Sequence, residues 1–259
     1  MLDREPYGLS PISPQGQSDA AESALRNAIV RCELEPGVRF SEVELCSKFA
    51  FGRGAIRAAL SRLQGQSFVS SAARSGWLIA PISASEIREV SAGRRQLEPL
   101  LCNVVLTSGD RSSLHRLAEM QMALMQRYEL EPNSLATIRR CERDILRSLA
   151  TRMAMPTIGG WLETLWERSE RLVNFFESTG AEKLKPAPRW LFVEALLTDR
   201  RADAASSLRD ANQAIETFLL DRFLQSEAIV GVATPARLKS TTQQIHPERS
   251  VTFNLRTVR

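Results

Sequence analysis

The sequence predicts a mostly α-helical protein that begins with a small α+β unit and continues as an all-α antiparallel helical bundle. Between Arg39 and Pro81, a short β-prone piece is followed by two helical patterns and then by two β-prone runs that flank a loop. Beyond Pro81, apolar residues recur at helical spacing and no strand pattern is present. With 259 residues and 43% hydrophobic content, the chain is long enough to bury the cores of two domains.

The chain is expected to begin with a flexible arm, a helix and a turn. Residues 1–17 are rich in Pro, Gly and Ser and show no periodicity, which is typical of a flexible arm. A helix is expected from Ser18, because the following apolar residues share one helical face: Ala21, Leu25, Ala28, Ile29 and Cys32. Glu35-Pro36-Gly37 ends this helix in a turn that leads to a short strand at residues 38–40.

Two short helices follow, and the second has a basic face. Ser41 and Glu44 have the spacing of a capping box, which predicts a helix from Ser41 to about Phe49. After an interruption at residues 50–52, a second helix places its apolar residues on one face: Ile56, Ala59, Leu60 and Leu63. Arg53 and Arg57 share the opposite face, with Arg62 beside them. No Asp or Glu occurs from residue 48 to residue 76.

This order of elements favours DNA binding. Two helices joined by a tight turn form a helix-turn-helix, whose second helix enters the major groove. A guanidinium group there can donate two hydrogen bonds to a guanine edge or to phosphate. The β-prone runs at residues 68–69 and 77–79 predict a hairpin, or wing, whose loop carries Arg74. We therefore expect a winged helix-turn-helix at residues 18–81; the alternative is a solvated basic helix beside a hairpin lid.

Residues 25–81 resemble the winged helix-turn-helix of the GntR family of bacterial transcription regulators. The segments that carry the resemblance are Ala28 to Glu42, Gly52 to Leu63, and Arg74-Ser75-Gly76. The resemblance implies that the recognition helix and the tip of the wing contact DNA. The expected DNA-binding residues are Arg53, Gly54, Arg57, Arg62, Arg74 and Gly76. Where the family has a hydroxyl residue followed by Arg, Thr and Pro, this chain has Gly52 to Ala55, so a side-chain helix cap is missing.

The second half is expected to be a bundle that begins after a linker at residues 82–84. A domain at residues 85–225 is expected to contain helices at about 85–106, 111–128, 136–153, 156–178, 189–197 and 202–223. A basic tail at residues 226–259 follows. Residues 231–259 hold five basic residues and one acidic residue, which accounts for the whole formal net charge of +4. The prediction of DNA binding therefore rests on the local cluster and not on net charge.

The helical half resembles the effector domain of the FadR-like branch of that family, the FCD domain. The resemblance rests on Arg94 to Pro99, on Arg147 to Ala150 before Met155-Pro156, and on Glu194-Ala195-Leu196. Members of that branch commonly hold a divalent metal with one carboxylate and three histidines. This chain has only His115 and His246, and the matched positions are occupied by Glu142, Leu146, Arg189 and Asn212. Leucine has no lone pair and arginine stays protonated, so we expect no metal and no other cofactor.

A small-molecule effector is expected in the helical domain, near Arg94, Glu142, Arg189 and Asn212. A buried arginine can bind a carboxylate bidentately, so an organic acid is one candidate. In the alternative interpretation, Arg94 pairs with a glutamate of the bundle and Arg189 lies on the surface.

The expected function is a cytoplasmic, homodimeric transcription regulator that binds an inverted repeat in duplex DNA, and the family resemblance implies a repressor. No run approaches the length of a membrane span, and residues 1–17 lack the apolar centre of a signal peptide. Catalysis is not expected, because Arg57 stands where a dinucleotide loop needs its third glycine and two histidines give no credible Ser-His-Asp set. The competing function is a helical scaffold or adaptor whose winged domain binds protein.

Overall fold

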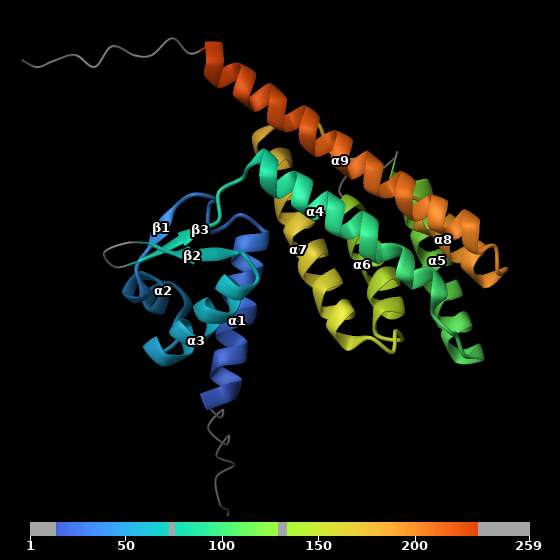
Figure 1. Cartoon of the computed structure of the whole chain (residues 1–259), viewed down its shortest axis with the longest axis horizontal. Coiled ribbons are helices and arrows are strands. Elements are labelled where there is room, and N and C mark those ends of the chain that lie inside the picture. The colour runs from blue at the N-terminus through green and yellow to red at the C-terminus, as the bar shows by residue number, and fades with distance from the viewer. Residues whose placement is uncertain (1–13, 73–75, 129–133, 233–259) are drawn as a thin grey trace, which may run out of the picture.

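The N-terminal half of the molecule is a winged helix-turn-helix. A computed structural model describes residues 14–72, 76–128 and 134–232 (Figure 1). In this half the elements are α1 (Pro14–Val30), β1 (Arg39–Phe40), α2 (Glu42–Phe49), α3 (Arg53–Gly65), β2 (Val69–Ser71) and β3 (Trp77–Ile79). The three strands form an antiparallel sheet in the order β1-β3-β2. The predicted fold class, including the hairpin, is confirmed.

Local sequence accounts for the two short helices. The backbone N–H of Ser41 donates to Glu44 Oε2 at 2.7 Å, and the N–H of Glu44 donates to Ser41 Oγ at 3.2 Å, which completes the predicted capping box. Gly52 caps α3 without any side-chain hydrogen bond. The apolar face of α3 is buried against α1, and the shared core includes Leu25, Ile29, Ile56, Leu60, Leu63 and Phe68.

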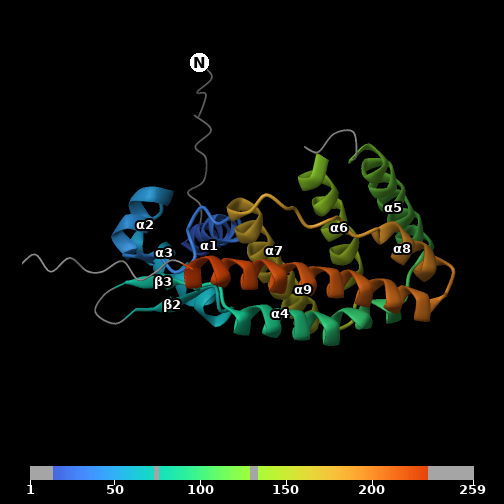
Figure 2. The ribbon, with the colours of Figure 1, turned by 90° about the horizontal axis from the view of Figure 1, so that it is seen from above.

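The second half is a helical bundle. Its elements are α4 (Ala84–Leu97), the 3-10 helix η1 (Glu98–Asn103), α5 (Ser108–Tyr128), α6 (Leu135–Ala150), α7 (Pro156–Thr179), α8 (Arg189–Leu197) and α9 (Arg201–Val232). Helices α4 and α9 run side by side, and α5 to α8 all lie on the same side of that pair (Figure 2). In the part of the chain that the structure describes, no helix is long and apolar enough to cross a membrane.

Three predicted boundaries are wrong. The single helix expected at residues 85–106 ends at Leu97, because Pro99 lacks an N–H and the chain continues as the 3-10 helix. The first helix begins at Pro14, four residues inside the predicted arm, and proline is well suited to the start of a helix. Helix α9 continues to Val232, into the predicted tail. The remainder of the arm and of the tail lies outside the described residues.

Helices α6 and α7 are joined by a ladder of ion pairs. Arginines spaced four apart on α6 meet glutamates spaced seven apart on the antiparallel α7. The pairs are Arg139–Glu177, Arg143–Glu170 and Arg147–Glu163. Four and seven residues are both near-integral numbers of helical turns, so each series stays on one face of its helix. The ladder fixes the register of the two helices that flank the cavity described below.

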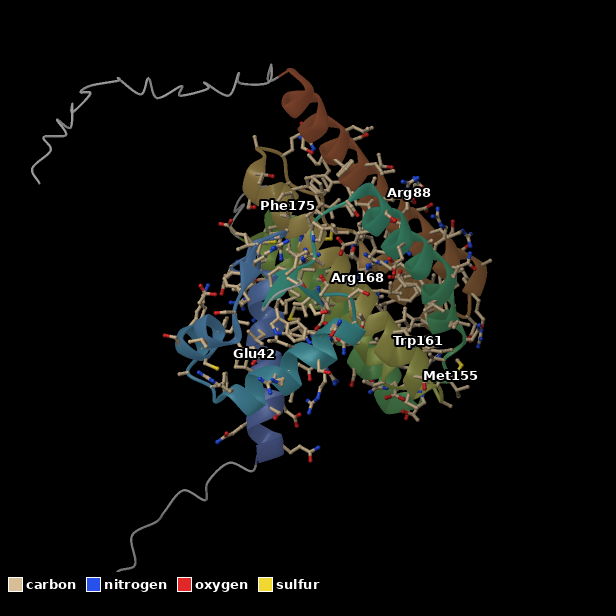
Figure 3. The ribbon with its side chains drawn as sticks, turned by 60° about the vertical axis from the view of Figure 1, so that its left-hand side comes forward. Glu42, Arg88, Met155, Trp161, Arg168 and Phe175 are labelled. Atoms are coloured by element: carbon tan, nitrogen blue, oxygen red, sulfur yellow. The ribbon has the colours of Figure 1, made fainter. Side chains whose placement is uncertain are left out.

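The two halves meet along α7. Asn174 Nδ2 donates to the carbonyl oxygen of Val30 at the end of α1, at 2.8 Å, and Arg26 of α1 pairs with Glu167 at 2.8 Å. The fully buried Arg171 donates to Glu86 Oε1 at 2.9 Å and to the carbonyl of Ala80 in the linker. Arg168 lies beside this junction (Figure 3). The position of the winged domain is thus set by one face of α7.

Replacement of Gly52 by serine is expected to stabilise the winged domain. A Cβ at Gly52 would meet nothing within 4 Å, and its φ of −67° suits any residue. A serine hydroxyl would supply the missing cap and reduce the entropy of the unfolded chain, so the free energy of unfolding should rise by about 0.5–1 kcal/mol. The midpoint of chemical denaturation measures this change.

Gly76→Ala is the matched control and should lower the midpoint. Gly76 has φ +152°, and a Cβ there would lie 3.1 Å from the carbonyl oxygen of Phe40. If Gly52→Ser lowered stability as well, the absence of a side-chain cap on α3 would not be a weakness of this domain.

Candidate functional site

The outer face of α3 is basic and exposed. Arg53, Gly54 and Arg57 are all exposed, and the Arg57 side chain retains 70% of its accessible surface. The opposite face of the same helix is fully buried, so the helix cannot rotate without exposing its core residues. Within the described residues, Arg53 makes no hydrogen bond or ion pair. The arginines are therefore presented outward, on the helix that a helix-turn-helix inserts into a groove.

Arg57 is oriented by an acidic residue from the preceding helix. Its Nε donates to Glu42 Oε1 at 3.1 Å and its Nη2 donates to Glu42 Oε2 at 2.8 Å. These hydrogen bonds from Arg57 lower the pKa of Glu42, and the charge of Arg53 adds to the effect. The bidentate contact holds the guanidinium group in one plane. Sequence analysis missed Glu42, because it precedes the stretch free of acidic residues.

Arg62 differs from the expectation. Its Nη1 donates to Asp19 Oδ1 at 2.6 Å and to Glu22 Oε2 at 2.9 Å, both on α1, so the guanidinium group is committed to holding α1 and α3 together. Gly54 is open to solvent, with nothing within 4 Å of a Cβ built there. Gly76 lies where the wing approaches β1, and Arg74 lies outside the described residues. Of the six expected residues, Arg53, Gly54, Arg57 and Arg62 are exposed, and of these Arg62 is held by acidic residues of α1.

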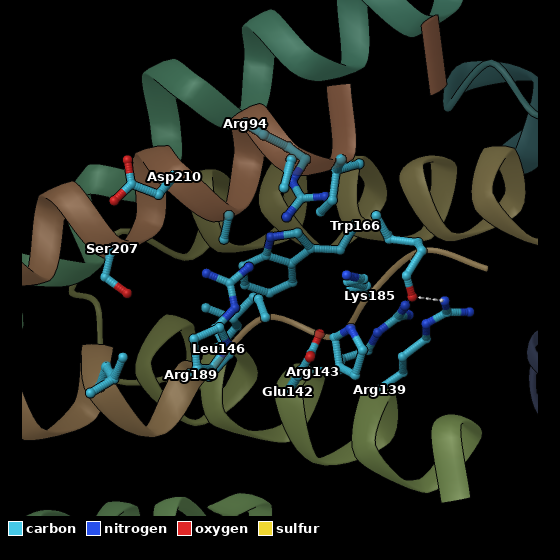
Figure 4. Close-up of a pocket in the computed structure, with 18 of the residues that line it drawn as sticks. Arg94, Arg139, Glu142, Arg143, Leu146, Trp166, Lys185, Arg189, Ser207 and Asp210 are labelled. Carbon is cyan, nitrogen blue, oxygen red and sulfur yellow. Dashed lines mark hydrogen bonds between the residues drawn. The ribbon is translucent and has the colours of Figure 1, made fainter. Parts of the chain in front are cut away.

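A cavity of about 640 Å³ lies in the helical bundle, with walls from α4, α6, α7, α8 and α9. Its volume lies within the range of about 300–1,000 Å³ that is usual for small-molecule sites. Arg94, Glu142 and Arg189 line it, together with apolar surface from Leu146 and Trp166 (Figure 4). Three of the four residues expected near an effector, Arg94, Glu142 and Arg189, thus line one cavity. Asn212 does not line this cavity.

Arg94 belongs to a closed network around the buried Glu98. Glu98 Oε1 accepts from Arg94 Nε and from Trp166 Nε1, both at 2.7 Å, and Oε2 accepts from Asn212 Nδ2 at 2.8 Å. Arg94 Nη1 donates to Ser169 Oγ at 2.7 Å. Burial tends to raise the pKa of Glu98, but the charges of Arg94 and Arg189 and these hydrogen bonds outweigh burial and lower it. Glu98 is therefore held ionised.

The alternative interpretation was half right. Arg94 does pair with a glutamate of the bundle, but Arg189 is not on the surface, because only 2% of its accessible surface is exposed. Among the described residues, its Nε and Nη1 have no hydrogen-bond partner, and neither has Glu142 Oε1. Burial lowers the pKa of Arg189 and raises that of Glu142, while each charge opposes the shift of the other. Glu98 and Trp166 were missed, although Glu98 follows Arg94 by one helical turn.

The donor set does not fit a metal ion. Leu146, at the position of a family histidine, contributes only apolar surface to the cavity. In the described part of the chain, no three His, Cys, Asp or Glu side chains are grouped so as to hold a metal. His115 is exposed on α5 beside Glu119, and His246 lies outside the described residues. The cavity presents a cation and a carboxyl group instead.

Glu98→Gln is expected to destabilise the helical bundle strongly. The substitution keeps the shape but leaves the charges of Arg94 and Arg189 without their buried counter-ion, which should cost about 3–5 kcal/mol in the free energy of unfolding. Denaturant titration followed by circular dichroism measures the loss. Glu194→Gln is the control, because Glu194 pairs with Arg200 at the surface and is 58% exposed, so its loss should cost less than about 1 kcal/mol. Equal effects of the two substitutions would contradict a special role for Glu98.

Comparison with known proteins agrees with this architecture. Residues 17–79 match the family model described as bacterial regulatory proteins, gntR family. The chain is 28% identical over 85 residues to the HTH-type transcriptional repressor GlaR of Escherichia coli K12, a match that covers 33% of this chain and 39% of GlaR. It is 30% identical over 115 residues to the uncharacterized HTH-type transcriptional regulator BphR of Paraburkholderia xenovorans LB400, covering 42% of this chain and 47% of BphR.

The structural match is wider than the sequence matches. The solved structure of E. coli McbR/YncC superposes with a TM-score of 0.63 at 20% identity, covering 80% of this chain and 98% of that chain, which shows a shared fold. The chain matches less than half the length of the two curated relatives. Those relatives are named as regulators and not as enzymes, in agreement with the expectation that this chain is not an enzyme. Residues 17–79, which form the winged helix-turn-helix, are thus similar to the gntR family of bacterial regulatory proteins.

Proposed function

We propose that this chain is a DNA-binding transcription regulator of the GntR type, with an FCD-type effector domain of the FadR-like branch. The observation that carries the proposal is the exposed pair Arg53 and Arg57 on α3, opposite a fully buried face and beside a wing. Such a helix can place both guanidinium groups in a major groove, where each can donate to a guanine edge or to phosphate. In our proposal Gly54 allows close approach to the DNA backbone, and Gly76 and Arg74 contribute from the wing.

The proposed regulator acts as a homodimeric repressor. Two winged domains related by a two-fold axis match an inverted repeat, with half-sites about one helical turn apart. The name of GlaR describes that relative as a repressor, which supports the same sign of control here. The proposed effector is a small carboxylate that binds at Arg189 without a metal. It controls transcription only if it binds the DNA-competent and DNA-incompetent arrangements with different affinity.

Substitution of the two arginines tests the DNA-binding proposal. Arg53→Ala and Arg57→Ala should each weaken operator binding by about 10- to 100-fold, which corresponds to about 1–3 kcal/mol for one lost contact. Footprinting of the promoter region beside the protein's own gene identifies the operator, and gel shift measures the affinity. Arg116→Ala is the matched control, because it removes the same charge from an exposed position on α5. Unchanged binding by the double variant Arg53→Ala, Arg57→Ala would remove this site assignment.

Salt dependence separates the regulator from a scaffold or adaptor that binds protein through its winged domain. A regulator that neutralises phosphates releases counter-ions, so its affinity for DNA should fall by roughly a factor of 10³–10⁵ between 50 and 200 mM salt if it makes about 6–10 phosphate contacts. Arg57→Ala should reduce the slope of log affinity against log salt. A scaffold would show no salt-dependent binding to the promoter DNA at any concentration tested.

A further inference from the structure

One buried cation in the bundle differs from the others. The described part of the chain contains four buried arginines. Arg94 pairs with Glu98, Arg168 with Glu89 and Arg171 with Glu86. Arg189 forms no ion pair with a described residue, although it lies fully inside the protein and lines the cavity. An ionised donor that is buried without hydrogen bonds costs free energy, so Arg189 lowers the stability of the folded protein unless a partner supplies those hydrogen bonds.

A carboxyl group lies in the same cavity and is also incompletely bonded. Glu142 extends from α6 and Arg189 extends from α8 into the same space (Figure 4). They are close enough for each charge to shift the pKa of the other, yet no ion pair joins them. Glu142 Oε1 is buried and unbonded, as are Nε and Nη1 of Arg189. The cavity therefore offers a cationic donor and a carboxyl oxygen that both lack hydrogen bonds to described residues and are not joined by an ion pair.

Most of the other charges that line the cavity are paired, whereas Lys185 and Asp210 line it from exposed positions without an ion pair to a described residue. Glu98 has partners on both oxygens, and Arg94 is shared between Glu98 and Ser169. The ladder pairs of α6 and α7 occupy Arg139, Arg143 and Glu170. A ligand with only a carboxylate would satisfy Arg189 but would place its anion in the cavity with the carboxyl group of Glu142. A ligand that also carries an ammonium group would satisfy both sites without changing the net charge of the cavity.

We propose that the effector is an amino-acid-like zwitterion, whose carboxylate binds Arg189 and whose ammonium group binds Glu142. The inference rests on the proposed function and names the chemical class of its effector. The apolar body of the ligand packs against Leu146, Trp166 and Val173, which also line the cavity. L-amino acids with uncharged side chains have this combination of groups.

Proton uptake by Glu142 distinguishes the binding of a plain carboxylate from the binding of a zwitterion. Burial raises the pKa of Glu142, and the rise is opposed by Arg189, by the backbone N–H of Ala187, and by Arg139 and Arg94. A plain carboxylate could bind if Glu142 first took up a proton and became a donor, so its binding would be accompanied by proton uptake. A zwitterion needs Glu142 ionised and requires no such uptake.

Calorimetric titration of the full chain at pH 7.5 tests the proposal. The probes are the L-amino acids with uncharged side chains. Each amino acid that binds is compared with the acid that lacks only its amino group and with the amine that lacks only its carboxyl group. We expect at least one amino acid to bind about tenfold or more tightly than both analogues. Repetition in buffers of different ionisation enthalpy should show no net proton uptake. A panel in which no amino acid binds, or in which the acids bind equally well, would overturn the proposal.

The variant Glu142→Gln assigns the ammonium site. It should weaken binding of the amino acid about tenfold or more while leaving the affinity for the acid equal or higher. Glu170→Gln is the matched control, since Glu170 lines the same cavity but is paired with Arg143, and it should preserve the preference for the amino acid. Circular dichroism verifies that both variants are folded. Unchanged selectivity in Glu142→Gln would refute the assignment.

The outcomes also separate this inference from the proposed function. Acids that bind as tightly as amino acids, with uptake of about one proton, would refute the zwitterion and leave a carboxylate effector in place. Failure of every acid, amine and amino acid to bind would refute both effector proposals. Operator binding and its loss in the Arg53 and Arg57 variants are measured without any ligand, so the DNA-binding proposal stands or falls separately.

Discussion

A guanidinium group with no exposed surface, that of Arg171, joins the two halves of this molecule. It donates to Glu86 at the start of α4 and to the carbonyl of Ala80 in the linker, while its own backbone carbonyl accepts from Cys32 Sγ at 3.6 Å. Burial raises the pKa of Glu86, and the charge of Arg171 opposes that rise, so the ionised form of Glu86 depends on Arg171. A buried pair of this kind tolerates little displacement, because separation would leave two uncompensated charges inside the protein. The linker is therefore fixed at this point.

Helix α7 has two functional faces that are rigidly coupled. Trp166 and Ser169 face the cavity network, whereas Glu167, Arg171 and Asn174 hold the winged domain. These positions are interleaved within nine residues of one helix, so a rotation or shift that follows ligand binding moves the contacts to the winged domain as well. Helix α7 is thus a physical connection between the cavity and the winged domain, and in the proposed regulator its influence on DNA binding would equal the difference in ligand affinity between the DNA-competent and DNA-incompetent arrangements.

The sequence predicted what depends on local pattern and missed what depends on distant partners. The apolar face of α3 and the capping box of α2 follow from spacing within a few residues. The commitment of Arg62 to α1 could not be predicted, because its acidic partners lie about 40 residues earlier and meet it only when α1 crosses α3. The sequence left open whether Arg189 is buried or on the surface for the same reason, since only the packing of α8 in the bundle decides it. Pro99, in contrast, could have predicted the end of α4 from the sequence, but the helical spacing of the apolar residues was given more weight.

The arginines on α3 and the buried Arg189 differ in what their charges cost the folded protein in free energy. Arg53 and Arg57 remain in water, where an unpaired or surface-paired charge costs little free energy. Such arginines can neutralise DNA phosphates, which releases counter-ions. Arg189 has lost its hydration inside the bundle and has not recovered it through an ion pair, so its cost is present in the folded protein before any ligand arrives. A partner that supplies the missing hydrogen bonds recovers that cost as binding free energy. In the proposed regulator, the burial of Arg189 without an ion pair would thus be the feature that gives the cavity a preference for a ligand bearing an anion.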